Sequence, residues 1–135
     1  MQRAACLRCR DASYLGGTVP TIRDVVDAFA RRDGVEAVII LGSDGLAIDS
    51  RTPSGTDPEA LAALIPNVLR ACAQLGATAN GGDLEMGVLE FRGRAAVVSN
   101  LSAEAKLLVL ASPRANIGPL LFDLKRYRAE IAGLL

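Results

Sequence analysis

Hydrophobic and polar positions along the chain follow two periodicities, which predict three helices and five strands. Residues 35–41 are apolar at nearly every position, as in a strand that is covered on both faces and lies inside a sheet. The dipeptide Asp44-Gly45 follows and favours the tight turn of a hairpin, because glycine supplies the positive φ that such a turn needs. The sheet is therefore expected to begin with an antiparallel pair near 35–42 and 46–51.

Helical spacing of apolar residues predicts a first helix over about 21–33 and a last helix over about 116–135. Thr21 is a suitable N-cap for the first, with Asp24 three residues further on, and Gly34 is suited to end it. In the last helix Pro119 stands in the opening turn, where its missing amide costs nothing.

A second helix is predicted over 57–76, because Asp57 can cap free amides and Pro58 suits a first turn. Pro66 lies inside this helix and predicts a bend. Two of its faces are suited to burial. The large stripe consists of Leu61, Leu64, Ile65, Val68, Leu69, Cys72 and Leu75. The smaller, mixed flank consists of Ala60, Ala63, Asn67, Ala71 and Gln74.

Three further strands are predicted over 83–92, 95–101 and 105–111, and their short connections make them sequential and antiparallel. The order is α-β-β-α-β-β-β-α. The predicted fold class is α+β, with a five-stranded antiparallel sheet between one long helix and a two-helix layer. Predicted inward positions of this sheet are Ile39, Leu41, Val88, Val97 and Val109.

The chain divides into a head, residues 1–18, and a domain, residues 19–135. The head lacks periodicity, is rich in arginine and is expected to be disordered or a tail outside the domain. It carries Cys6 and Cys9 in a Cys-x-x-Cys pair, which is half of a zinc site. Chance occurrence is the preferred interpretation, with metal binding and redox chemistry as alternatives. Cys72 is interpreted as a small core residue.

Composition bounds the function. Fifteen basic and fifteen acidic residues cancel, which argues against nucleic acid as a partner. No apolar run approaches the roughly 20 residues that span a bilayer, and the start lacks the apolar core of a secretion signal, so no membrane insertion and a cytoplasmic location are expected. The chain contains no histidine, so neither a Ser-His-Asp arrangement nor a His-bearing metal site is possible. We expect no enzyme and no cofactor.

The chain resembles the Roadblock/dynein-light-chain domain family, in its bacterial and archaeal branch of MglB-like small-GTPase regulators. The likeness covers residues 21–135. It rests on the order of the elements, on residues 34–41 leading to Ser43-Asp-Gly-Leu46, on the alanine-rich helix from Asp57, and on residues 115–118 opening the last helix. The family pattern has no catalytic residues to transfer.

The resemblance implies a homodimer in which the second helices pack together and the third strands pair across a two-fold axis. The residues expected at this interface are Ala60, Ala63, Ala71, Leu84, Met86 and Val88. The resemblance also implies a Ras-like small GTPase as partner. We expect it to bind the solvent side of the helix pair, at Asn67, Arg70 and Gln74.

The sequence leaves three further hypotheses about the function open. One of the arginines 51, 70, 92 and 94 is a candidate to reach into the active site of the GTPase, although each is more often a solvated surface charge. A structural adaptor without a GTPase shares the same dimer. A small-molecule sensory module needs a roomy cavity with convergent polar groups, which the aliphatic inward positions would fill.

Overall fold

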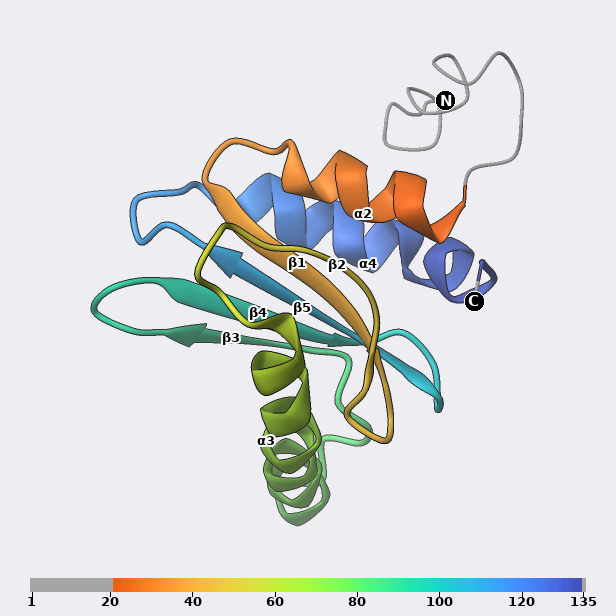
Figure 1. Cartoon of the computed structure of the whole chain (residues 1–135). Helices are drawn as coiled ribbons and strands as arrows, with labels where there is room; N and C mark the ends of the chain where they lie inside the picture. Colours follow the sequence, from red (N-terminus) through yellow and green to blue (C-terminus); the bar gives the residue numbers. More distant parts are fainter. Residues whose placement is uncertain (1–20, 135) are drawn as a thin grey trace.

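A computed structural model describes residues 21–134, which form three helices and five strands in three layers (Figure 1). The predicted head, with Cys6 and Cys9, lies outside the described residues. The elements are α2 (Ile22–Ala30), β1 (Val35–Gly42), β2 (Ala47–Arg51), α3 (Pro58–Thr78), β3 (Met86–Glu90), β4 (Ala95–Asn100), β5 (Ala105–Ala111) and α4 (Gly118–Ala132). Their order confirms the predicted fold class.

The sheet is antiparallel throughout, with strand order β2-β1-β5-β4-β3. β1 pairs with β2 on one side and with β5 on the other, which confirms that the apolar run lies inside the sheet. The turn between β1 and β2 contains Gly45 at φ +85°, as predicted, and Asp44 Oδ1 accepts a hydrogen bond from the amide of Leu46 at 3.0 Å. The two edges of the sheet are β2 and β3.

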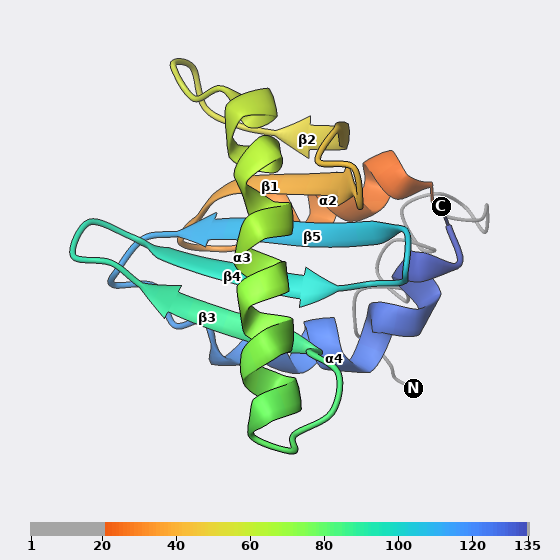
Figure 2. The ribbon, with the colours of Figure 1, turned by 90° about the horizontal axis from the view of Figure 1, so that it is seen from below.

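The sheet separates two hydrophobic cores, because successive residues of a strand point to opposite faces. α2 and α4 cover one face and α3 covers the other, as predicted (Figures 1 and 2). The core under α2 and α4 includes Val26, Phe29, Val38, Ile40, Val97, Val109, Leu120, Leu124, Tyr127 and Ile131. The core under α3 is formed by Ala37, Ile39, Leu41, Ala62, Ile65, Leu69, Ala96, Val98, Leu108 and Leu110.

Helix starts agree with the sequence signals. Thr21 and Asp24 form a capping box at α2: the Thr21 amide donates to Asp24 Oδ2 at 2.8 Å, and the Asp24 amide donates to Thr21 Oγ1 at 3.2 Å. Asp57 caps α3 by accepting a hydrogen bond from the amide of Glu59 at 3.0 Å. α3 continues through Pro66 as one helix.

Three sequence expectations are wrong in detail. The sequence predicts Leu64 and Leu75 in the large apolar stripe of the second helix, yet they are 61% and 69% exposed. Val88, expected to point inward, is 38% exposed because β3 is an edge strand. The strand expected over 83–92 is shorter, because residues 83–85 approach β4 without forming a regular ladder.

α3 is the one helix of residues 21–134 that is long and apolar enough to cross a membrane, by length and composition alone. No long run of large apolar residues marks this helix in the sequence, because its hydropathy comes from alanines interspersed with leucine, isoleucine and valine. In the structure α3 packs onto the sheet through Ala62, Ile65 and Leu69, and helices of soluble proteins pass the same test.

Candidate functional site

One flank of α3 carries an apolar row that its own sheet covers only in part: Leu64, Ala71 and Leu75 are exposed, whereas Leu61 packs partly on the core and Val68 is half-buried. The row consists of Leu61, Leu64, Val68, Ala71 and Leu75, and we call it the α3 seam. Its members are three and four residues apart in alternation, which is the spacing by which two helices pack along a shared seam. The buried side of the helix lies on a neighbouring face, so Leu64 and Leu75 are mostly in solvent. The seam is therefore suited to cover by a second helix.

The opposite flank of α3 lies against the β1–β2 turn. A Cβ built on Gly45 would stand 3.4 Å from Pro66 Cγ and 3.5 Å from Ala63 Cα. Ala63, expected at the dimer interface, thus lies on the side of the helix away from the seam. The other two predicted alanines are exposed, with Ala71 on the seam itself and Ala60 on the outer face of the first turn.

An open groove of about 520 Å³ runs along the free edge of β3, between the end of α3 and α4. It is lined by Cys72, Gly76, Gly81, Gly82, Asp83, Leu84, Glu85, Met86, Val88, Leu121 and Lys125. The three strand residues predicted at the dimer interface, Leu84, Met86 and Val88, are brought together here. Cys72, predicted as a core residue, is half-buried in the wall of the groove.

The two faces of β3 point to different layers. Val88 opposes Val97, a member of the core under α2 and α4, whereas Leu89 opposes Ala96, a member of the core under α3. Even-numbered residues of β3 therefore face the α4 layer and odd-numbered residues face the α3 layer. α3 crosses the strands and reaches the edge of the sheet at β3 (Figure 2). The C-terminal part of the α3 seam therefore lies beside the free edge of β3, whereas its N-terminal part lies over β2 and β1 (Figure 2).

Side chains from β4 and α4 hold the approach to β3. The side-chain Nδ2 of Asn100 donates a hydrogen bond to the carbonyl of Leu84 at 2.8 Å, and the backbone N–H of Asn100 donates to the carbonyl of Glu85 at 3.1 Å. The Glu85 carboxylate also pairs with Arg128 of α4 at 3.7 Å. Sequence reasoning missed Asn100 and Arg128. Both contacts join residues far apart in the chain, so no local pattern indicates them.

The predicted partner surface lies on the solvent side of α3. Asn67, Arg70 and Gln74 are all exposed, and Arg70 Nη1 donates to Asn67 Oδ1 at 2.7 Å. Leu46, 62% exposed, follows Gly45 in the turn that packs against Ala63 and Pro66. An apolar residue missed by sequence reasoning thus stands near the polar row. Such a mixture is typical of a protein-binding surface.

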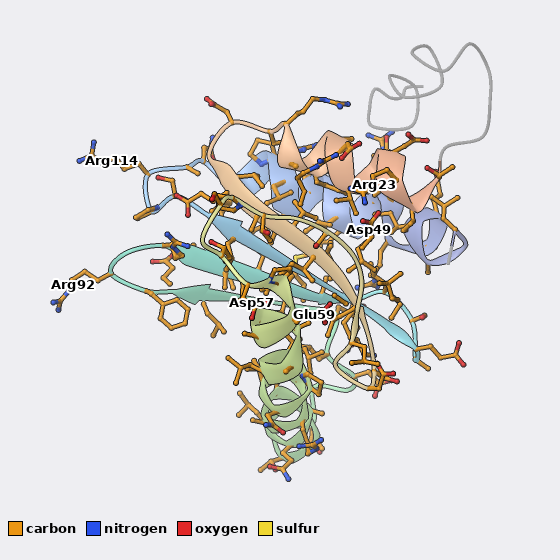
Figure 3. All side chains as sticks on the ribbon, in the orientation of Figure 1. Arg23, Asp49, Asp57, Glu59, Arg92 and Arg114 are labelled. Carbon is orange, nitrogen blue, oxygen red and sulfur yellow. The ribbon has the colours of Figure 1, made fainter. Side chains whose placement is uncertain are left out.

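Other charged candidates are already engaged or isolated. Arg51 binds Asp27 of α2, and Arg94 pairs with Glu36 at 3.4 Å. Arg23 and Asp49 form an ion pair of 2.8 Å on the α2 side of β2, where Figure 3 shows them close together. Residues 21–134 contain no group of three or more side chains that could hold a metal ion.

A small-molecule sensory module needs an internal cavity beside the sheet. Aliphatic side chains occupy that space here, since Ile39, Leu41, Val97 and Val109 are fully buried in the two cores. The groove at β3 is an open surface feature with an edge strand as its floor, and a smaller hollow of about 190 Å³ lies beside the start of α4. Neither shape favours the enclosure of a small ligand.

The family model of the Roadblock/LC7 domain matches residues 21–111, and the chain belongs to this family. It is similar to an uncharacterized protein of Methanocaldococcus jannaschii, MJ1340, with 27% identity over 105 residues, 77% of this chain and 90% of that protein. Among solved structures, MglB of Myxococcus xanthus shares the fold with a TM-score of 0.76 and 18% identity, covering 84% of this chain and 93% of that one. A second structure, an MglB with a tetrameric arrangement, shares the fold with a TM-score of 0.73 and 15% identity, covering 97% of this chain and 91% of that one.

Proposed function

We propose that this chain is a homodimeric, non-catalytic regulator or scaffold of a Ras-like small GTPase in the cytoplasm. The observation that carries the proposal is the α3 seam beside the free edge of β3. In one protomer the edge of β3 has no neighbouring strand and the seam leucines are exposed to solvent. A second copy related by a two-fold axis at β3 would supply both a neighbouring strand and a neighbouring helix. Membership of the Roadblock/LC7 family and the self-assembly of a structural neighbour in a tetrameric arrangement support it.

In the proposed dimer the β3 strands pair into one sheet of ten strands, twice the five of each protomer. The α3 helices lie side by side through Leu61, Leu64, Val68, Ala71 and Leu75. Their solvent sides then form one surface that presents Asn67, Arg70 and Gln74 twice. A GTPase bound there is regulated only if its triphosphate state binds more tightly than its diphosphate state, because equal binding shifts no equilibrium.

Two measurements test the proposal. Sedimentation of the full chain at micromolar concentration gives its oligomeric state. Titration with Ras-like GTPases of the same organism, in both nucleotide states, then measures binding. A dimer that prefers the triphosphate state supports it. A dimer that binds no GTPase in either state supports the structural adaptor instead. A small molecule bound stoichiometrically within one protomer would support the sensory module.

We expect Arg70→Ala to raise the Kd for the GTPase about five- to tenfold, because exposed arginines at protein interfaces contribute on the order of 1 kcal/mol or more. The stimulated hydrolysis rate at saturating dimer should stay unchanged, since Arg70 is bound to Asn67 on its own helix and acts in docking. Calorimetry and single-turnover hydrolysis measure the two quantities.

Gln74→Ala on the same helix face is the matched comparison, with a smaller expected loss because it removes no charge. A fall of two decades in the saturated rate with an unchanged Kd would show instead that Arg70 acts on the transferred phosphoryl group.

A further inference from the structure

Charges are ordered along β3 and the residues around it. Asp83 and Glu85 precede the apolar centre of the strand, and Arg92 and Arg94 follow it. When such a strand pairs antiparallel with a second copy of itself, the start of each strand lies beside the end of the other. The acidic end then meets the basic end twice, once on each side of the two-fold axis.

Two of these four charges form no ion pair with another described residue of the protomer. Glu85 pairs with Arg128 and Arg94 pairs with Glu36, whereas Asp83 and Arg92 form no ion pair among residues 21–134. Asp83 lines the groove at the free edge. Arg92 projects from the β3–β4 hairpin into solvent (Figure 3). Each is therefore available to a second copy.

Lys125 and Glu90 are two further side chains of opposite charge, and they do not pair with each other. Neither makes an ion pair in the described part of the chain. Lys125 lines the groove from α4, and Glu90, an even-numbered residue of β3, belongs to the same face of the sheet as Val88. A second copy of Glu90 entering the groove would thus approach Lys125 from the layer to which both belong.

The register follows from the faces of the strand. A two-fold axis perpendicular to the sheet keeps each face on its own side, so residues directly opposite each other share a face. An axis at Val88, the middle residue of β3, places Glu90 opposite Met86 of the second copy. Arg92 follows the end of β3 and Asp83 precedes its start, so the same axis brings the Arg92 end of each strand toward the Asp83 end of the other.

We propose that Arg92 with Asp83 of the second copy, and Lys125 with Glu90 of the second copy, fix the register of the β3–β3 pairing and restrict it to a second copy of this chain. The inference rests on the proposed homodimer and adds its specificity. Seam packing supplies most of the affinity, and the charges select the partner and the alignment, since like charges in a shifted register repel.

The test uses charge reversal in the full chain. Arg92→Glu and Asp83→Arg, each alone, should raise the dimer Kd about tenfold, because two exposed ion pairs are lost and replaced by like-charge contacts. An equimolar mixture of the two variants should form a heterodimer with a Kd near that of the wild type. Sedimentation with one variant fluorescently labelled measures all three values.

Arg114→Glu is the matched control, because Arg114 is exposed at the same end of the molecule on the β5–α4 loop and lies off the proposed interface (Figure 3). Thermal unfolding of each variant checks the fold. If a single reversal unfolds the protein, the combined Arg92→Glu/Asp83→Arg chain, which restores opposite charges across the axis, takes its place and should dimerise like the wild type.

Several results would overturn the inference. Single reversals that dimerise as tightly as Arg114→Glu would show that these charges are not at the interface. Weak single variants whose mixture stays weak would show that Arg92 and Asp83 do not face each other. A monomeric wild type would instead remove the homodimer on which the inference rests, and so identifies a different failure.

Discussion

Leu64→Asp is expected to convert the dimer into monomers, with a rise in Kd of at least about 100-fold, since an unpaired buried charge costs several kcal/mol. The two-fold axis repeats the substitution, so one change introduces two carboxylates into the same apolar seam. The monomer should keep its fold, because Leu64 is 61% exposed and contributes little to the core of its own protomer. Sedimentation and circular dichroism measure association and folding separately.

Ile48→Asp is the matched control for this substitution. Ile48 is also an exposed aliphatic residue, but it lies on β2, at the opposite edge of the sheet from β3. It should leave the dimer intact. If Leu64→Asp dimerises as well as Ile48→Asp, the α3 seam is not the interface. If Leu64→Asp is monomeric but still stimulates a GTPase fully, the regulator acts through one protomer.

The misassignment of Leu64 and Leu75 has a physical origin. Residues that face a partner helix repeat every three or four positions, just as residues that face the protein's own core do. The stripe read from the sequence of α3 therefore combined two rows, one toward the sheet and one toward the seam. Only the structure, which shows that Ile65 and Leu69 are buried while Leu64 and Leu75 are open, separates them.

Local signals predicted most of the fold. The turn at Asp44-Gly45, the capping box at Thr21 and the cap at Asp57 each depend on residues within a few positions of one another, and all three are present. The pairing of β1 with β5 was not predicted, since it joins strands separated by most of the domain. That pairing leaves β3 at an edge, so the long-range topology creates the candidate site.

Gly34 provides the second large effect. It connects α2 to β1 with φ +83°, and its carbonyl accepts a hydrogen bond from the amide of Ser112 at 2.8 Å. A Cβ at this position would stand 3.2 Å from Ala115 Cα and would overlap its Cβ. Gly34→Ala should therefore lower the free energy of unfolding by about 2–5 kcal/mol, from an unfavourable φ and from overpacking. Urea unfolding at one fixed protein concentration measures it.

Gly55→Ala separates the two causes, because Gly55 has nearly the same backbone angle, φ +87°, with nothing within 4 Å of a built Cβ. It should cost only the backbone part, about 1–2 kcal/mol. Adding Ala115→Gly to the Gly34→Ala chain removes the opposing Cβ and should recover about 1–3 kcal/mol of stability. Equal losses at Gly34 and Gly55, or no recovery in the double variant, would show that the loop before α4 yields to the new side chain. The close approach of the two loops would then contribute little to the placement of α4 beside the groove.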